Sequence, residues 1–390
     1  MINKITIFRM IFFIIILFSD IKIQKYIMPN PVLDSITNKE NFISKTKAIK
    51  KGKLFLEQCL KGKLSNKIKF QIAKKPKVTL IIPLYNTGKF IKFIVRSVQN
   101  QNIDDIEIIL INDFSIDNGL TLKTMEQLKE EDPRIILINN RKNMGILYSR
   151  SIGVLISKGE YIMNLDHDDF IFDENIFETG YISAKFGNFD IISFTYVISK
   201  DYNFEIIEPP YINIKHNYIV TQPRLSSYPL FENDTFSYHD FTIWAKLYKN
   251  DIYKKSVNFL TFERYSVFNT YNEDLIGLFT ICNVANNYKY IKKYGVYHRD
   301  FNKSASYTAK EEKRVFDDIF FSEIIFDLGK EQFKKYGAIF LIQRVYLSNN
   351  KNNNYLLKVL NKIMNCELIE EKYKREIKFK FGKLLVNKNC

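Results

Sequence analysis

Three carboxylates fall within four consecutive positions near the middle of the chain. Asp166, Asp168 and Asp169 surround His167 in the run Asp-His-Asp-Asp. Carboxylates crowded this closely repel one another, which raises their pKa values and costs stability unless a cation neutralises them. Mg²⁺ and Mn²⁺ are hard cations that one or two carboxylates hold together with substrate phosphates. The run therefore predicts a divalent-metal site, and the alternative is a helix N-cap, which suits Asp169 better than the other two.

Polar loops also follow two earlier apolar runs. Pro83-Leu-Tyr-Asn follows residues 78–82, and Asn112-Asp-Phe-Ser follows residues 106–111. The carboxyl ends of parallel strands form one edge of a sheet, and ligands bind outside that edge. Each loop alone is consistent with an ordinary turn, because Asp and Asn favour turns. Three such loops at one edge indicate a site for a polar ligand.

The elements that must position these loops alternate along the chain. Short apolar runs predict strands at 78–82, 106–111, 135–138, 161–165 and 190–194. Helical patterns lie between them, at 89–100, 120–131, 146–157 and 174–185. This alternation predicts an α/β fold with a mostly parallel sheet that helices cover on both faces, which explains strands without polar alternation. After about residue 308 the pattern is helical to the end.

Composition limits the classes of function. The chain has 390 residues, 46% of them apolar, and a net charge of +15. A basic chain could attract an anionic partner, but the lysines are spread along the sequence and no zinc-finger spacing or basic heptad region accompanies them. We therefore interpret the charge as a general background and expect no nucleic-acid partner. The four cysteines form no CxxC pair, so no zinc or redox motif is indicated.

An apolar segment stands at the N-terminus. Residues 10–18 (MIFFIIILF) follow Lys4 and Arg9, as in the charged and apolar regions of a secretory signal. No A-x-A-like cleavage site follows, and a helix over residues 5–18 is shorter than the hydrocarbon core of a bilayer. An uncleaved signal anchor, a cleaved signal and a cytosolic apolar helix remain open. Our expectation is a membrane location with a single pass near the N-terminus, and the alternatives are a secreted or a cytoplasmic protein.

The region from the first strand to the acidic run resembles the nucleotide-sugar half of family 2 glycosyltransferases of the GT-A fold. Three stretches carry the resemblance, in the family's order and spacing: VTLIIPLYN, IEIILINDFSIDN and NMGILYSRSIGVLISKGEYIMNLDHDD. The family's loop after the second strand is closer to Asp-Asp-Gly-Ser, whereas this chain has Asn112-Asp113-Phe114-Ser115. The departure leaves Asp113 as the contact expected on the uracil side and bears on the identity of the base.

The resemblance implies a set of donor-side residues. Nucleotide-sugar binding would fall to Pro83, Tyr85, Asn86, Asp113, Ser115, Asn143, Gly145, Arg150 and Asp166. Asp166 and Asp168 match the family's DxD pair. Asp168 would bind the Mn²⁺ or Mg²⁺ that bridges the diphosphate, and Asp166 would face the ribose or metal-bound water. His298 would be a third metal ligand, with an ordinary pocket or surface histidine as the alternative.

The acceptor half resembles the family more loosely. Trp244 and Lys246 match a short segment found in some members, and Glu273-Asp274 match the family's Glu-Asp pair at the start of a helix. The resemblance implies that Asp274 is the catalytic base of an inverting transfer, and helix capping is the alternative. Arg299 would stabilise the departing diphosphate, because a guanidinium can bind phosphate through two hydrogen bonds.

These inferences combine into one expectation. An N-terminal segment (1–28) and a basic stem (29–76) would precede a GT-A domain at 77–305 and a helical extension at 306–390. The domain would divide into a nucleotide-sugar half (77–200) and an acceptor half (201–305). It would move a sugar from a nucleotide-diphospho-sugar, expected to be a UDP-sugar, to a glycan, lipid or protein acceptor. Rival hypotheses are a nucleotide-sugar-binding pseudoenzyme, a sugar-phosphate nucleotidyltransferase and a nucleic-acid-binding protein. Nucleotidyltransferases carry a Gly-rich signature near the first strand, and this chain does not have it.

Overall fold

The structure is a computed structural model of the chain. It describes residues 45–60, 73–200, 205–207, 218–222, 224–227, 230–232, 235–236, 242–265, 272–300, 310–345 and 353–386. The chain divides into two units, 1–42 and 43–390, and every described residue belongs to the second unit. The predicted N-terminal segment (1–28) therefore lies outside the described residues.

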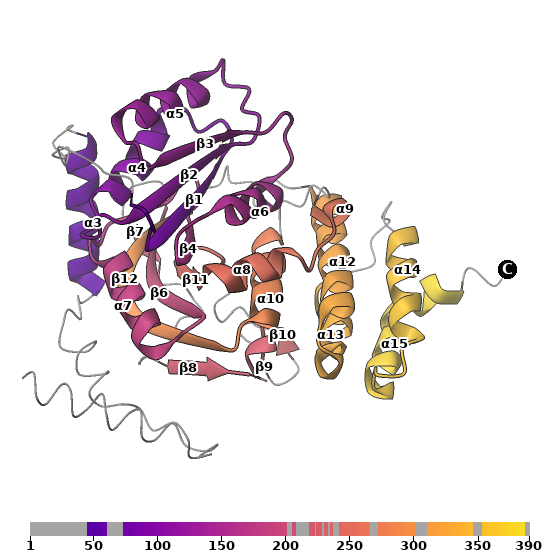
Figure 1. Cartoon of the computed structure of the whole chain (residues 1–390). Helices are drawn as coiled ribbons and strands as arrows, with labels where there is room; N and C mark the ends of the chain where they lie inside the picture. Colours follow the sequence, from indigo (N-terminus) through magenta and orange to yellow (C-terminus); the bar gives the residue numbers. More distant parts are fainter. Residues whose placement is uncertain are drawn as a thin grey trace, which may run out of the picture. The chain divides into compact units, whose positions relative to one another are not determined.

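A mixed sheet forms the centre of the second unit (Figure 1). Its described strands are β1 (Val78–Leu84), β2 (Ile106–Asn112), β3 (Ile135–Asn139), β4 (Tyr161–Asn164), β5 (Phe170–Ile171), β6 (Ile191–Lys200), β7 (Glu205–Ile207), β8 (Tyr218–Thr221), β11 (Lys246–Lys249) and β12 (Asn287–Asp300). The spatial order is β3-β2-β1-β4-β11-β6-β12-β5, while β7 pairs with β6 and β8 pairs with β12. The strands β9 (Phe231–Glu232) and β10 (Thr235–Phe236) form a separate pair.

The first four strands in this order are parallel to one another. The next strand, β11, runs antiparallel to both β4 and β6. The five strands expected from apolar runs therefore appear as β1, β2, β3, β4 and β6, and the antiparallel strand β11 was not foreseen. Its sequence, KLYK, contains no apolar run that would predict a buried strand. The strand is buried because it lies between β4 and β6, which are distant along the chain.

Helices cover both faces of the sheet. They are α4 (Ile91–Gln99), α5 (Leu120–Glu131), α6 (Ile146–Ile156), α7 (Ile176–Gly187) and α8 (Asn250–Val257). The short helix α9 (Phe262–Tyr265) follows α8, and α10 (Glu273–Val284) packs on α6 and α8. Every residue of β1 and β2 is buried, as expected for strands packed on both sides. Residues Leu80 and Ile82 belong to the core cluster that includes α4, whereas Ile81 belongs to the cluster that includes α6 and α10.

Helix α6 lies very close to β1. A Cβ atom on Gly153 would stand 2.6 Å from Cγ2 of Ile81, which is closer than carbon atoms pack. Only glycine permits this approach, because it has no Cβ. The close packing sets the height of α6 above the sheet and thereby positions Arg150, which lies one helical turn earlier.

The predicted helical extension follows the sheet. It consists of α12 (Glu311–Leu328), α13 (Lys335–Arg344), α14 (Asn353–Met364) and α15 (Glu371–Val386). Its aromatic side chains pack on α10: the ring of Phe321 lies 6.4 Å from that of Phe279 and 4.9 Å from that of Phe340, edge to face in both pairs. The extension thus shares one apolar core with the helix that begins with the predicted base.

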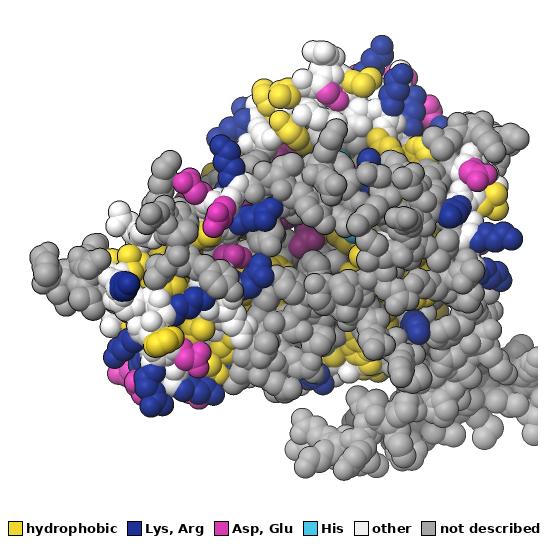
Figure 2. Space-filling model, turned by 180° about the vertical axis from the view of Figure 1, so that it is seen from behind, with side chains coloured by type: hydrophobic (Ala, Val, Ile, Leu, Met, Phe, Trp, Pro, Cys, Tyr) yellow, Lys and Arg dark blue, Asp and Glu magenta, His cyan; other side chains and the backbone are white. Residues whose placement is uncertain are grey.

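Helix α3 (Lys45–Leu60) falls within the predicted basic stem. The ring of Phe55 stacks on that of Phe170 at 5.6 Å, and Lys51 forms ion pairs with Asp173 and Glu174. The helix therefore packs against strands β5 and β12. On the face shown in Figure 2, the Lys and Arg side chains of the described residues are scattered, which matches their even spread along the sequence.

The expected membrane location needs correction. Among the described residues, which do not include the N-terminal segment 1–28, no helix combines the length and the apolar character needed to cross a bilayer, so the expected single-pass anchor finds no support in the structure.

Candidate active site

The acidic run lies in the loop between β4 and β5, at the carboxyl end of β4. No helix begins there, because α7 starts only at Ile176, so the N-cap alternative for Asp169 is wrong. The Asp169 side chain is fully buried, and its carboxylate lies 3.0 Å from Nδ1 of His298 and accepts a hydrogen bond from the backbone N–H of Arg299 at 3.1 Å. Asp169 therefore ties the acidic loop to the end of β12.

His298 is held between this carboxylate and an aromatic ring. Its imidazole stacks on the Trp244 indole with a centroid distance of 4.5 Å. Burial lowers the pKa of His298, but the charge of Asp169, the hydrogen bond to Asp169 and the charges of Asp168 and Asp166 together raise this pKa to about 9. At neutral pH the imidazole is therefore protonated on both nitrogens and positively charged, and its Nδ1 faces Asp169. The role of His298 as a metal ligand stays a prediction. Because Nδ1 faces Asp169, Nε2 would be the atom that binds the metal.

Asp168 is a carboxyl group of the loop whose ionised form is disfavoured, although His167 and His298 act in the opposite direction. Burial, followed by the charge of Asp169, raises the pKa of Asp168 to about 6. Both effects disfavour the ionised form, and a bound cation would reverse them. Among the described residues, no set of three or more His, Cys, Asp or Glu side chains is arranged to hold a metal ion. Asp168 nevertheless fits a metal whose other ligands are substrate phosphates.

A buried arginine connects the acidic loop with the start of α10. Arg150 on α6 is 1% exposed, and its two terminal nitrogens donate to different carboxylates. Nη2 lies 2.5 Å from Oδ1 of Asp166, and Nη1 lies 2.5 Å from Oδ1 of Asp274. Burial acts to lower the pKa of Arg150, but these two carboxylates raise it above its ordinary value. The guanidinium stays charged and joins the predicted donor side to the predicted base.

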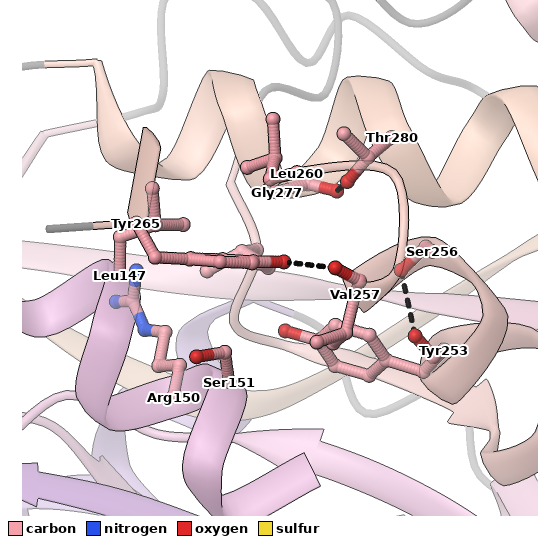
Figure 3. Close-up of a pocket in the computed structure, with 11 residues that line it drawn as sticks. Leu147, Arg150, Ser151, Tyr253, Ser256, Val257, Leu260, Tyr265, Gly277 and Thr280 are labelled. Carbon is pink, nitrogen blue, oxygen red and sulfur yellow. Dashed lines mark hydrogen bonds between the residues drawn. The ribbon is translucent and has the colours of Figure 1, made fainter. Parts of the chain in front are cut away.

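A small cavity lies behind this guanidinium, between α6, α8 and α10 (Figure 3). It is lined by Leu147, Arg150, Ser151, Ile243, Tyr253, Ser256, Val257, Leu260, Tyr265, Gly277 and Thr280. Nε of Arg150 is buried and has no hydrogen-bond partner among the described residues. The Tyr265 side chain also lines the cavity, and its hydroxyl points away from Arg150 and donates to the carbonyl of Val257 at 2.8 Å (Figure 3). Among the described residues that line the cavity, Arg150 is the one with a charged side chain.

Glu273 and Asp274 form the first turn of α10. Burial raises the pKa of Asp274, although Arg150 lies against it and the backbone N–H of Ile243 donates to it. Burial and the neighbouring charge of Asp274 raise the pKa of Glu273 to about 8, so Glu273 is largely protonated at neutral pH. A carboxylate with a raised pKa is a stronger base than an exposed one, which suits proton removal.

The loops after β1 and β2 are joined to each other. The backbone N–H of Asn86 donates to Oγ of Ser115 at 2.9 Å, and Oδ1 of Asn86 accepts from the N–H of Ile116 at 2.8 Å. Tyr85 and Phe114 are partly exposed beside these contacts, and Phe114 has a positive φ of 61°. A left-handed backbone is unusual for an aromatic residue, and the family pattern has glycine there.

Asp113 is buried and holds the next loop. Its carboxylate accepts hydrogen bonds from the amide of Asn140 at 2.7 Å and from the backbone N–H groups of Met144 and Gly145 at 2.8 Å each. Oδ1 of Asn143 accepts from the N–H of Gly145 as well, at 3.1 Å. Asp113, Asn143 and Gly145 therefore lie together, as the resemblance implied, and Asp113 shapes the loop besides any contact with a base.

The predicted acceptor-side residues have different settings. Trp244 is buried between the rings of Tyr196 and His298. Lys246 is fully buried, and its ammonium donates to the carbonyl of Thr242 at 2.5 Å and to the hydroxyl of Thr242 at 2.9 Å. Lys246 thus braces the turn that carries Trp244, and its acceptor-side role stays a prediction.

The structure brings most predicted residues into two groups. The first group lies at the acidic loop and consists of Asp166, Asp168, Arg150, Asp274 and His298. The second group consists of the loops after β1 and β2 and the loop at 143–145. Sequence reasoning missed the pairing of Asp169 with His298 and the bridging position of Arg150. The partners are 129 and 124 residues apart along the chain, so no local pattern signals them.

Comparisons with known proteins agree with this geometry. Residues 79–256 match the model of "Glycosyl transferase family 2". Over 174 residues the chain is 32% identical to a cholesterol galactosyltransferase of Borreliella burgdorferi, covering 45% of this chain and 44% of that protein. It is 30% identical over 128 residues to glycosyltransferase GlyG of Streptococcus pneumoniae, covering 33% and 40%. The matched part thus spans less than half the length of these relatives.

A solved structure extends the likeness of the fold. S. aureus TarS in complex with UDP-GlcNAc superposes with a TM-score of 0.56 at 15% identity, covering 79% of this chain and 86% of that one. At this identity the match concerns the fold alone, and it includes more of the chain than the sequence matches do. Residues 79–256 of this chain therefore match the family 2 glycosyltransferases in sequence, and the fold is GT-A.

Proposed function

We propose that this protein transfers a sugar from a UDP-sugar to an acceptor hydroxyl with inversion, that it needs Mn²⁺ or Mg²⁺, and that Asp274 is the general base. The observation that carries the proposal is the bridge through Arg150. One buried guanidinium contacts both Asp166 of the acidic loop and Asp274 of α10. A group that binds beside Asp168 is therefore within reach of a carboxylate from the other half of the domain.

The proton transfer falls to Asp274. Its carboxylate accepts the proton of the acceptor hydroxyl while the hydroxyl oxygen attacks the anomeric carbon. The bond from that carbon to the diphosphate breaks, and the diphosphate leaves with the electron pair. Attack from the side opposite the leaving group inverts the anomeric centre. The buried position that raises the pKa of Asp274 supports this role.

The charge on the leaving diphosphate needs stabilisation. Asp168, with Asp166 beside it, would hold the metal ion, which when bound supplies positive charge to the phosphate oxygens. Arg299, whose backbone is fixed by Asp169, would add a second positive charge. Arg150 keeps Asp166 and Asp274 in place and stays charged throughout. His298 keeps its proton through Asp169 and orients the same loop.

The choice of donor rests on two further facts. TarS, which shares the fold, was solved with UDP-GlcNAc and with UDP. The family resemblance implies that Tyr85 and Asn86 line the nucleotide and that Asp113 contacts its base, and the loops that carry Asn86 and Ser115 are joined by hydrogen bonds. These facts support a uridine diphosphate donor, and a donor with another base is the outcome that would correct this part of the proposal.

Replacing the base separates binding from transfer. We expect Asp274→Asn to bind UDP with Mn²⁺ as the wild type does, and to lose transfer by roughly 10²- to 10⁴-fold, because general-base catalysis contributes about that much. Calorimetry measures UDP binding, and nucleotide release from a panel of UDP-sugars measures turnover. Near-normal release by this variant would show that another group removes the proton.

A further inference from the structure

The first turn of α10 is attached to the C-terminal extension. The amide of Asn272, the N-cap residue, donates a hydrogen bond of 2.9 Å to Oδ1 of Asp318 on α12. Asn272 makes no side-chain capping bond to its own helix, although Asn at this position ordinarily accepts one from the first turn. Its side chain is therefore committed to a residue 46 positions away rather than to local capping.

Asp318 is well fixed for this contact. It is 6% exposed, and Arg344 at the last turn of α13 supplies a positive charge toward it. The neighbouring Asp317 pairs instead with Lys313 on the same helix, at 2.5 Å. The two adjacent carboxylates of α12 thus have different partners, and Asp318 is the one that accepts a hydrogen bond from Asn272 at the start of α10.

We propose that Asp318 is a positioning residue for the transfer reaction, because it fixes Asn272 and thereby the carboxylate of Asp274, two residues further along α10. The inference rests on the proposed function of Asp274 as the base. It also assigns a role to the C-terminal extension, which holds the acceptor side of the site in register with Arg150.

The geometry explains why this anchor matters. Asp274 meets Arg150 at 2.5 Å, and a first turn that opens or shifts carries the carboxylate away from that contact. Misplacement of a reacting group by about 1 Å can cost roughly 10²-fold in rate. Donor binding does not depend on α10 in the same way, because the loops after β1 and β2 are fixed by their own hydrogen bonds.

Three variants of the full chain test the proposal. Asp318→Ala removes the acceptor of the Asn272 amide, Asp318→Asn keeps an acceptor oxygen, and Asp317→Ala removes the adjacent carboxylate as a matched control. With UDP-GlcNAc and Mn²⁺, we expect Asp318→Ala to lower kcat for UDP release roughly 10- to 100-fold, with KM changed by less than about twofold. Asp318→Asn should recover most of the rate, and Asp317→Ala should stay close to wild type. Equal losses in Asp318→Ala and Asp317→Ala, or a loss confined to KM, would overturn the proposal.

Hydrogen–deuterium exchange gives a readout that needs no activity. We expect the amides of the first turn of α10 to exchange roughly tenfold faster or more in Asp318→Ala, and those of α6 to stay unchanged, because only the anchor of the helix start is lost. Unchanged exchange in that turn overturns the proposal even if the enzyme is active. A wild type that releases no UDP from UDP-GlcNAc would count against GlcNAc as the donor sugar, and the exchange result would still decide whether Asp318 fixes this turn.

Discussion

Asp113 is a buried carboxylate of the candidate site and Asp274 a partly buried one, and the two are held in different ways. Asp113 accepts from N–H groups of one nearby loop, two of them backbone groups. Asp274 is held by a guanidinium 124 residues away in the sequence, and its helix is anchored to α12. The donor edge is therefore built from local backbone contacts, whereas the acceptor side depends on charges brought together by the whole fold. Four substitutions test this difference.

The largest effect on transfer is expected at Asp168. Asp168→Ala should lower the metal-dependent rate by roughly 10³-fold or more, because a bound metal contributes several kcal/mol to the stabilisation of the leaving group. Stability should change by less than about 1 kcal/mol, since burial and Asp169 already disfavour the ionised carboxyl. A Mn²⁺ titration of UDP-sugar turnover measures the metal-dependent rate, and urea denaturation measures the stability. The control is Asp105→Ala, which removes an exposed ion pair with Lys77. An unchanged Mn²⁺ dependence of turnover in Asp168→Ala would show that Asp168 is not a metal ligand.

The next largest effect concerns stability on the acceptor side. Arg150→Met should lower the free energy of unfolding by about 3–5 kcal/mol, because it leaves two partly buried carboxylates unpaired. Adding Asp274→Asn to this variant should recover part of the loss, since one orphaned charge is removed. Urea denaturation of the single and double variants measures both. A loss below about 1 kcal/mol for Arg150→Met would mean that the bridge does not hold the two halves together.

A smaller effect is expected at the donor edge. Asp113→Asn should cost about 1–3 kcal/mol, because one of the three donors to the carboxylate then faces an NH₂ group rather than an acceptor oxygen. UDP affinity should fall as well, while kcat at saturating donor should change little. The same urea melts, together with calorimetric UDP titrations, give these values. If this variant lost more stability than Arg150→Met, the comparison between local and long-range support would be reversed.

The smallest effect is a pH dependence. The folded-state pKa of Glu273, about 8, lies above its ordinary value of 4.5, so folding favours the protonated form between these values. Its contribution to stability is full below about 4.5 and is lost as the pH rises through 8. His298, with a raised pKa of about 9, loses its contribution over an overlapping window, above its ordinary value of 6.5. Thermal melts between pH 6 and 9 should therefore fall less steeply in Glu273→Gln than in wild type. Parallel curves would show that Glu273 ionises normally.

Much of the donor edge could be predicted from the sequence. The strands β1, β2 and β4 are apolar runs that end in polar loops, so the place of Asn86, Asp113 and Asp168 follows from the parallel order of the strands. The close packing of Gly153 on Ile81 and the Asp113 contacts to the 143–145 loop join residues distant in the sequence, and they follow from the fold rather than from a local pattern. The helical character of the C-terminal extension was equally visible, because periodicity is a local property.

The acceptor side could be predicted only through the family resemblance. Lysine side chains are usually exposed, but strand β11 places Lys246 in the core, where its ammonium donates to Thr242. The partner of Asp169 is His298, and that of Asn272 is Asp318, each fixed by how distant elements pack. Such pairs depend on topology rather than on neighbouring residues, so periodicity and spacing carry no sign of them.

The site as a whole is tested most directly by thermal stabilisation of the full chain with UDP, GDP and CDP, each with and without Mn²⁺. The proposed donor site predicts a rise in Tm with UDP that requires Mn²⁺ and disappears in Asp168→Ala, because a ligand that binds only the folded state stabilises it. No shift with any of the three nucleotides, or an equal shift in Asp168→Ala, would contradict a metal-dependent nucleotide-sugar site at the acidic loop.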